Sequence, residues 1–356
     1  MGNNWGIYGA NGYSGRLLAE YAVKQGQKPI LAGRSEAALK ALAADLECEY
    51  VVVDLADPTQ LLDFTRRVDV VVNCAGPFSA TAQPMITACI AGKAHYLDIT
   101  GEMDVFEWAH NDAVSSRARD AGVVVCPGTG FDVVPTDCLA AKLKDALPDA
   151  ISLEMAFAGS KQLSQGTAKT SVEGLGKGGC SRIDGALVSE PIAAHTREVA
   201  YGGSVGDKHS MSIPWGDVST AFVTTKIPTI KIYVPGSKNT AKKARGLYRW
   251  RWLFKRTWIQ NFLKKRIEKT VTGPNDDQRT ASPMHLWGRV ENASGESKEA
   301  RFVTPNGYDV TIYAPYAITQ HLLGGVEASG SLTPSQLMGS DFVWSLNDVT
   351  ELEWLN

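Results

Sequence analysis

The first 126 residues alternate between short apolar runs and longer segments of helical composition. Strands buried on both faces of a parallel sheet read as continuous apolar runs, and a helix connects each strand to the next. We therefore predict an α/β fold in which a doubly wound parallel sheet forms the N-terminal domain. The predicted strands are Trp5–Tyr8, Pro29–Ala32, Tyr50–Val53, Val68–Asn73, His95–Ile99 and Gly122–Cys126.

A glycine-rich turn follows the first predicted strand and opens a helical segment, Arg16–Lys24. Its spacing, GxxGxxG, differs from the GxGxxG fingerprint of dinucleotide-binding proteins. Glycines placed in this way let the backbone turn tightly and approach a pyrophosphate, while the N-terminus of the next helix faces the phosphates. The turn predicts a Rossmann domain that binds a nucleotide cofactor. The cofactor-binding residues that we predict here are Gly9, Asn11, Gly12, Tyr13, Ser14 and Gly15.

The residues after the second predicted strand select the cofactor. NAD-binding domains usually place an acidic residue there, which accepts hydrogen bonds from the ribose hydroxyl, whereas an Arg suits the 2′-phosphate of NADP. Arg34 stands where the acid would be, and Ser35 adds a hydroxyl. Because a guanidinium pairs with phosphate oxygens and stacks on a planar base, we predict that both residues bind NADP. The alternative is an Arg that ends a strand in solvent.

Polar residues and turns also end the third and fourth predicted strands. Ligands of doubly wound folds bind at the carboxyl ends of the strands, so we expect Asp54 near the adenine. The segment after the fourth strand should reach toward the ribose and nicotinamide. The residues that we predict to contact the cofactor there are Asn73, Ala75, Gly76, Pro77 and Phe78. Each could instead be an ordinary polar group or turn at a strand end.

Five motifs in a fixed order carry a family resemblance. They are the glycine turn, LAGRS at 31–35, VVNCAGPF at 71–78, HYLDITGE at 95–102 and PGTGFDVVPTD at 127–137. With these motifs the chain resembles the saccharopine dehydrogenase-like oxidoreductases, particularly the bacterial branch related to trans-acting enoyl reductases. Sparser matches follow at Gly166–Thr167–Ala168, Tyr308–Asp309–Val310–Thr311 and Leu332–Thr333–Pro334.

The resemblance implies an NADP-dependent oxidoreductase that transfers hydride between NADP(H) and a substrate with a C=N or C=C bond. It implies an NADP-binding Rossmann domain at residues 1–127, to which helices within 315–356 return. A second α/β domain on a mixed sheet, at residues 128–314, would bind substrate or form a dimer. In this half, the strand-like runs are Ser152–Ala158, Ala221–Thr225, Thr229–Val234, Trp287–Glu291 and Val310–Ala314, and the helical segments are Tyr316–Leu323 and Pro334–Leu337.

Three residues are candidates for the proton transfer that accompanies hydride transfer. Glu102 and Asp132 follow the fifth and sixth predicted strands, so both loops should lie on the cofactor side of the sheet. The alternative is that these carboxylates cap helices or hold loops through backbone amides. Lys169, in a Gly- and Thr-rich stretch, is a second kind of donor.

Composition limits the function classes further. The 356 residues are 44% apolar and 21% charged, with a formal net charge of -2, which is typical of a soluble enzyme. We find no apolar stretch of membrane-spanning length and no signal peptide, so we expect a cytoplasmic protein. The six cysteines form no CxxC pair and the six histidines no HExxH motif, so we expect neither a disulfide framework nor a metal site.

Residues 231–270 form a strongly basic segment, which contains thirteen Lys or Arg residues and a single acid, Glu268. The rest of the chain then carries 23 basic and 37 acidic residues, a charge of -14. Interleaved aromatic residues suit contact with a membrane surface or a lipid-like substrate. The bland alternative is a solvated helix pair or a homodimer contact; we do not expect a nucleic-acid partner. A lipid-associated nucleotide-binding protein without turnover is therefore the alternative function.

Overall fold

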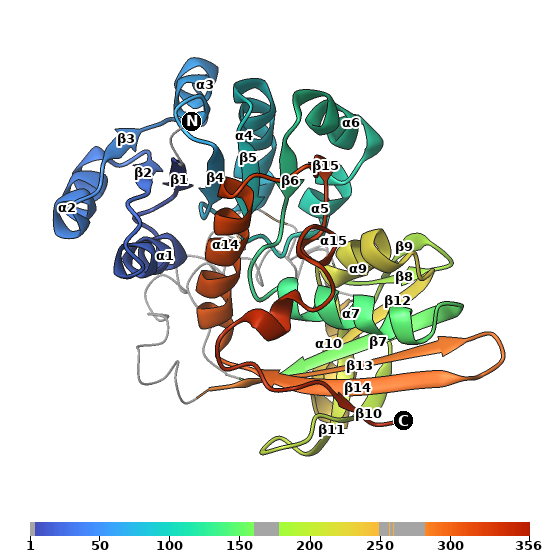
Figure 1. Ribbon diagram of the computed structural model, residues 1–356. Helices are drawn as coiled ribbons and strands as arrows, with labels where there is room; N and C mark the ends of the chain where they lie inside the picture. Colours follow the sequence, from blue (N-terminus) through green and yellow to red (C-terminus); the bar gives the residue numbers. More distant parts are fainter. Residues whose placement is uncertain (1–3, 160–177, 249–255, 257–258, 260–281) are drawn as a thin grey trace. The chain divides into compact units, whose positions relative to one another are not determined.

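The computed structural model describes residues 4–159, 178–248, 256, 259 and 282–356 (Figure 1). They fold into two compact units. The first contains Met1–Val134 and Tyr308–Gly339, and the second contains Pro135–Gly307 and Ser340–Asn356. Lys169, the segment Gly166–Thr167–Ala168 and most of residues 249–270 lie outside the described residues, so the predictions made for them stay predictions.

The first unit is built on a parallel sheet of seven strands among the described residues, in the order β15-β6-β5-β4-β1-β2-β3. Chain order reverses between β1 and β4, as in a doubly wound fold, and this confirms the predicted sheet. The strands are β1 (Trp5–Tyr8), β2 (Ile30–Gly33), β3 (Tyr50–Val52), β4 (Val70–Asn73), β5 (His95–Asp98), β6 (Val124–Cys126) and β15 (Gly330–Ser331).

Helices cover both faces of this sheet. On one face α14 packs beside α1 through a T-shaped ring contact between Tyr21 and Tyr316, and on the other α4 packs beside α3 and α6 (Figure 1). The helices are α1 (Tyr13–Lys24), α2 (Glu36–Leu46), α3 (Pro58–Thr65), α4 (Phe78–Gly92), α5 (Met103–Ala109), α6 (Asp112–Ala121), α14 (Gly307–Leu323) and α15 (Pro334–Met338).

The burial of the strands in the first unit explains why the sequence predicted them. All four residues of β1, β2 and β4 are buried, so the sheet has no polar side to break up the apolar runs. Tyr96 of β5 and Phe64 of α3 are 0% and 1% exposed and lie in the same core cluster. Strand β1 has the predicted bounds, and the ends of β2 to β6 differ from the predicted ones by at most two residues.

The second unit is built on a mixed sheet of nine strands among the described residues, which confirms the predicted fold class. β12 runs parallel to β7, and the other described pairs are antiparallel. The strands are β7 (Ala150–Ala158), β8 (Gly179–Ile183), β9 (Ala186–Glu190), β10 (Thr196–Ala200), β11 (Asp207–Ile213), β12 (Thr229–Pro235), β13 (Met284–Asn292), β14 (Ser297–Thr304) and β16 (Glu353–Trp354).

Side chains cover the two faces of this sheet differently. On one face Gly288 of β13 approaches Leu139 and Leu143 of α7, and a Cβ there would lie 2.7 Å from Leu143 Cδ1. The other face carries a small cluster that includes Tyr233 and Trp287, both nearly fully buried. The remaining elements of the unit are α7 (Val134–Ala146), which starts at the last residue of the first unit, α9 (Asp217–Thr225), α10 (Lys238–Leu247) and the 3₁₀ helix η2 (Phe342–Ser345).

Two predicted strands are wrong. Ala221–Thr225 lies within helix α9, and Val310–Ala314 lies within helix α14. Both segments are rich in β-branched residues, which favour strands locally, but their one-sided burial in helices outweighs that preference. None of the helices in the described part of the chain is long and apolar enough to cross a membrane.

Candidate functional site

Gly9 directly follows β1 and has a backbone conformation that favours glycine, with φ +79°. Its amide donates to Ala32 O at 2.8 Å, and its own carbonyl accepts from Gly12 N at 2.9 Å. A Cβ at Gly9 would lie 2.8 Å from Ala75 N, so the turn after β1 and the loop after β4 approach each other closely. The structure therefore brings the predicted residues Gly9, Gly12 and Ala75 together at the carboxyl ends of the central strands.

Gly15 brings helix α1 against this turn. A Cβ on Gly15 would lie 2.3 Å from Gly9 O, closer than any side chain can approach a carbonyl oxygen. Tyr13 and Ser14 occupy the first turn of α1, which contains no acidic residue. Because first-turn amides have no acceptor inside their own helix and the helix dipole is positive there, this geometry fits a pyrophosphate.

Arg34 and Ser35 follow β2 and are exposed at the same edge of the sheet. Asn11 Oδ1 lies 3.3 Å from the position of a Cβ on Gly33, so the Asn11 side chain reaches over the end of β2. Burial is the largest cause of the raised pKa of the Tyr8 phenol. The nearby Asp54 carboxylate raises this pKa further, and the Arg34 guanidinium lowers it. The charged residues that follow β2 and β3 thus lie near the Tyr8 phenol at the end of β1, and contact of Arg34 with a 2′-phosphate stays a prediction.

Asp54 makes its hydrogen bonds within a local turn. Its Oδ1 accepts from Ala56 N at 2.9 Å, and its own amide donates to Gln60 Oε1 at 3.0 Å. The side chain is exposed at the end of β3. This arrangement shapes the chain before α3, which is the structural alternative foreseen for this residue; contact with adenine stays a prediction.

Asn73 is fully buried and hydrogen-bonded within the protein. Its Oδ1 accepts from Ala75 N at 3.0 Å, and its Nδ2 donates to Thr81 Oγ1 at 3.3 Å and to Tyr96 OH at 3.2 Å. Thr81 Oγ1 in turn donates to Ala75 O at 2.6 Å. Asn73 therefore holds the loop after β4 from beneath, while Gly76 and Pro77 are exposed.

Glu102 caps helix α4. Its two carboxylate oxygens accept from Phe78 N and Ser79 N, each at 2.8 Å, and its own amide donates to Thr100 Oγ1 at 3.0 Å. A negative charge at a helix N-terminus is favourable because it meets the unpaired amides and the positive end of the dipole. The structure thus gives Glu102 a positioning role on the Gly76–Pro77–Phe78 loop, and a role in proton transfer stays a prediction.

Asp98 is a site residue that the sequence reasoning missed. It is 0% exposed at the end of β5 and accepts from Tyr96 OH at 2.7 Å, Thr100 N at 3.0 Å and Gly128 N at 2.8 Å. Burial raises its pKa to about 6, although these hydrogen bonds oppose the shift. An acid that ends an otherwise buried strand was the available signal. Asp98 joins the loops that follow β5 and β6.

Asp132 lies in the loop after β6 and packs against the loop after β5. Asp132 Oδ2 lies 2.6 Å from the position of a Cβ on Gly101, so a larger residue at position 101 would displace this carboxyl. Phe131 N donates to Thr311 Oγ1 at 3.1 Å, which ties the loop to α14. Burial raises the pKa of Asp132 to about 6. The structure therefore brings Glu102 and Asp132 onto neighbouring loops at the carboxyl edge of the sheet.

Metal ligands do not gather anywhere in the described residues, where no group of three His, Cys, Asp or Glu side chains could hold an ion. All six cysteines fall within the described ranges and are free thiols. Burial raises the pKa of the Cys74 thiol, beside the Asn73–Phe78 loop, to about 12. Cys74 is therefore a neutral thiol near neutral pH.

The strand order, the glycine turn after β1 and the helix N-terminus behind it together define a dinucleotide-binding Rossmann domain. Residues 5–126 match the family model described as the saccharopine dehydrogenase NADP binding domain. This match covers strands β1 to β6 of the first unit and includes Arg34.

Curated relatives match less than half of the chain. A saccharopine dehydrogenase-like oxidoreductase from Homo sapiens is 28% identical over 195 residues, which cover 48% of this chain and 45% of that protein. A trans-acting enoyl reductase from Mycobacterium tuberculosis is 31% identical over 138 residues, which cover 37% of this chain and 33% of that protein. The chain thus spans less than half of the length of the curated relatives it matches.

A solved structure matches along the whole chain. Apo saccharopine dehydrogenase (L-Glu forming) from Saccharomyces cerevisiae covers 100% of both chains with a TM-score of 0.67 and 13% sequence identity. At this identity the match establishes the fold of both units and nothing of the chemistry.

Proposed function

We propose that this chain is an NADP-dependent oxidoreductase that transfers hydride between NADP(H) and a substrate with a C=N or C=C bond. The observation that carries the proposal is the geometry of the NADP-binding domain. Gly9 and Gly15 leave room for a pyrophosphate at the N-terminus of α1. Arg34, exposed after β2, would bind the 2′-phosphate. The printed functions of the relatives, an oxidoreductase and an enoyl reductase, support the same reaction class.

The loops after β4, β5 and β6 supply the substrate side of the proposed site. NADPH, when bound, supplies the hydride that reduces the electrophilic carbon of the double bond. Asp132 holds the proton that the other atom of that bond takes up, because a carboxyl whose pKa lies at about 6 exchanges a proton readily near neutral pH. Glu102 acts on this site indirectly, since its carboxylate fixes the amides of Phe78 and Ser79.

A turnover assay tests this proposal. Purified protein is mixed with NADPH and a panel of imine and α,β-unsaturated acyl substrates, and the absorbance of reduced nicotinamide is followed. We expect turnover with at least one class, and a fall of about 100-fold or more in kcat for Asp132→Asn. Asp63→Asn, which removes an exposed carboxylate in α3, is the matched control. NADPH that binds but is never oxidised would instead support the binding protein without turnover.

The proposal includes a reducing, cytoplasmic setting and a homodimer. The free thiols of all six cysteines support the first, because disulfides are typical of oxidising compartments. Light scattering of the purified protein tests the homodimer.

Contact of the basic segment with a membrane remains part of the proposal. It is supported by the exposed cations Lys238, Lys242, Lys243 and Arg245 of α10.

A further inference from the structure

A cavity of about 240 Å³ lies in the second unit, outside the proposed nucleotide site. Strand β10 contributes Thr196, strand β11 contributes His209, and helix α10 contributes Lys238, Ala241 and Arg245. Three of the five lining side chains are basic and a fourth carries a hydroxyl. This composition distinguishes the cavity from an apolar packing defect.

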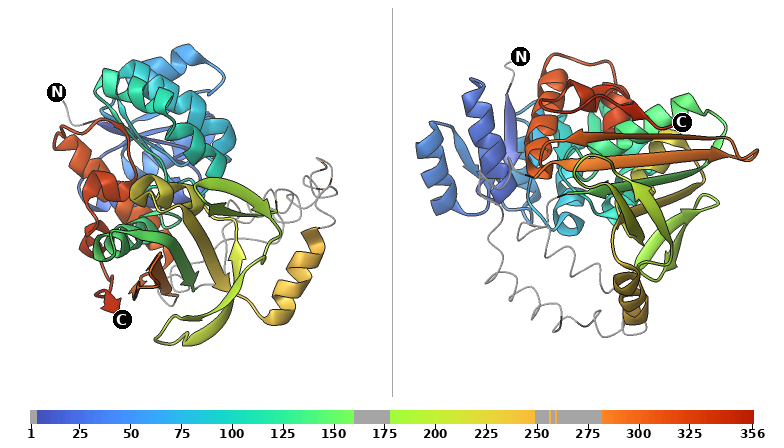
Figure 2. Two further views of the ribbon diagram at one scale, coloured as in Figure 1. Left: turned by 90° about the vertical axis from the view of Figure 1, so that its right-hand side faces the viewer. Right: turned by 90° about the horizontal axis from the view of Figure 1, so that it is seen from below.

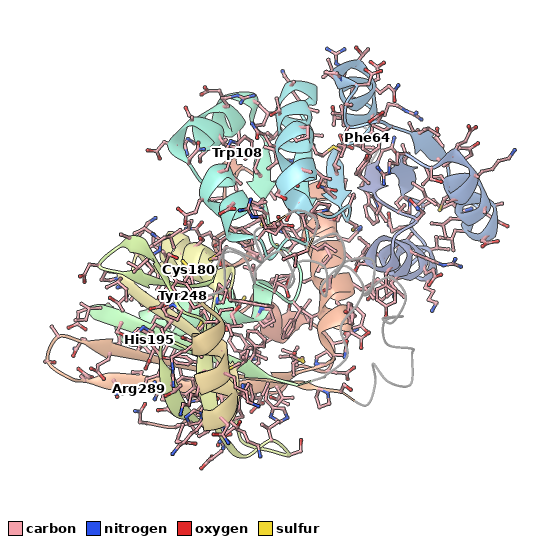
Figure 3. All side chains as sticks on the ribbon, turned by 180° about the vertical axis from the view of Figure 1, so that it is seen from behind. Phe64, Trp108, Cys180, His195, Tyr248 and Arg289 are labelled. Carbon is pink, nitrogen blue, oxygen red and sulfur yellow. The ribbon has the colours of Figure 1, made fainter. Side chains whose placement is uncertain are left out.

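Local structure fixes the wall that α10 forms. The helix begins directly after β12, where Ser237 caps it by accepting from Thr240 N at 3.1 Å. Lys238, Ala241 and Arg245 follow an i, i+3, i+7 spacing, so they lie on one face of the helix. Ala241 is 0% exposed and anchors this face. Figure 2 shows α10 as the gold helix beside the yellow-green strands, and Figure 3 labels Tyr248 just after it and His195 just before β10.

Two of the basic groups are held in place by backbone carbonyls. His209 Nδ1 lies 2.7 Å from Gly236 O, and a carbonyl only accepts, so Nδ1 carries a proton and donates it there. Arg245 Nη1 donates to Ala193 O at 2.7 Å. A guanidinium has five N–H donors, so this contact orients Arg245 without exhausting it. The imidazole and the guanidinium are thus anchored at the cavity.

No acidic side chain is among the five that line the cavity. Glu198 stands opposite His209 in the β10–β11 register, and Asp207 lies two residues before His209, but neither belongs to the lining. Cations gathered around one space repel each other unless an anion joins them. The lining therefore carries the positive charges of Lys238 and Arg245 and no negative charge, which suits an oxyanion.

We propose that this pocket binds a phosphate monoester through Lys238, Arg245, His209 and the Thr196 hydroxyl. A dianionic group with three terminal oxygens matches an Arg fork, a Lys point charge and the Thr196 hydroxyl better than a carboxylate does. Because the Nδ1 proton of His209 is donated to Gly236 O, this residue offers its Nε2 as a further donor only as the imidazolium. The monoester is either that of a small metabolite or that of an anionic lipid headgroup.

Calorimetric titration of the full chain with inorganic phosphate and with glycerol 3-phosphate tests the pocket. The variant Lys238→Ala/Arg245→Ala should weaken binding at least about tenfold, which corresponds to the loss of a charge-assisted contact. Lys208→Ala/Lys243→Ala removes two exposed lysines outside the lining and should change binding less than about threefold. Equal weakening by both pairs, or no binding by the wild-type chain at millimolar phosphate, would overturn the proposal.

Two further measurements complete the test. Thr196→Val removes one hydroxyl from an exposed strand position and should also weaken phosphate binding, so a pocket variant that fails to fold does not leave the proposal without a test. Flotation with phosphatidylcholine vesicles that contain phosphatidic acid identifies the source. Loss of flotation in the pocket variant assigns the site to a lipid headgroup, and phosphate binding without flotation assigns it to a soluble monoester. Binding that Thr196→Val and both alanine pairs leave unchanged would place the anion elsewhere.

Discussion

Replacement of Glu102 by Gln separates a positioning role from a role in proton transfer. The wild-type carboxylate accepts two backbone hydrogen bonds of 2.8 Å at the start of α4. Gln has the same shape but keeps one acceptor oxygen, and its amide group faces an N–H donor. Loss of one charge-assisted bond costs about 1.5–3 kcal/mol, and loss of the charge at the helix N-terminus costs about 0.3–1 kcal/mol. We expect the free energy of unfolding to fall by about 2–3 kcal/mol, since Glu102 is partly exposed and water moderates the loss.

Urea denaturation of Glu102→Gln beside Asp63→Asn measures this change, and NADPH titration of the same variants measures its effect on the site. The control should lose less than about 0.5 kcal/mol because Asp63 is an exposed surface residue. NADPH affinity should fall with the stability of the Gly76–Pro77–Phe78 loop. A variant as stable as the wild-type protein, with unchanged NADPH affinity but lost turnover, would refute the capping role and make Glu102 the proton-transfer group.

Three other changes test neighbouring parts of the account. Arg34→Asp should cut the preference for NADPH over NADH by roughly one to three powers of ten, because a charge-assisted contact of about 1.5–3 kcal/mol is replaced by repulsion; titration with both nucleotides checks this, and an unchanged preference contradicts it. Gly15→Ala should lower NADPH affinity and stability together, because its Cβ would lie 2.3 Å from Gly9 O; wild-type values for both would show that the turn is not tight. Asp98 has its pKa raised from 3.8 to about 6, so its neutral form is favoured by folding, and the stability it contributes at low pH is lost as pH rises from about 4 to about 6. The difference in unfolding free energy between the wild-type protein and Asp98→Asn should therefore shift by up to about 3 kcal/mol across that window, and a difference independent of pH contradicts the shift.

The first unit was largely predictable from the sequence because its strands are buried on both faces. Strands such as Val70–Asn73 then read as plain apolar runs, and Gly9 and Gly15 mark the turn that follows the first strand. Arg34 could be predicted as an NADP-binding residue because it is a cation and because it follows β2, where an acidic residue would favour NAD.

The strands and helices of the second half of the chain were harder to predict from the sequence. β9 (Ala186–Glu190) carries its apolar residues Leu187 and Val188 at exposed positions, and β10 (Thr196–Ala200) begins with three polar residues, so neither has the pattern of a buried strand. Val310 and Thr311 favour a strand locally, yet α14 buries Val310 in the first unit. Tertiary packing decides whether such a segment forms a strand or a helix, and a single sequence does not reveal that packing.

Roles in the candidate site depended on contacts between distant residues. Glu102 caps a helix that begins 24 residues earlier, and Asp98 accepts the amide of Gly128, 30 residues later. The sequence places these carboxyls at strand ends but contains no sign of which amides they meet. The fold was therefore predictable in outline, whereas the capping contacts of Glu102 and the loop contacts of Asp98 required the structure.

Calorimetric titration of the wild-type chain with NADPH and with NADH tests the central claim most directly. The account predicts that NADPH binds, and that it binds about tenfold or more tightly than NADH, because only NADPH offers a 2′-phosphate to Arg34. Failure to bind either nucleotide, or equal affinity for both, would contradict the claim that the glycine turn and Arg34 form an NADP site.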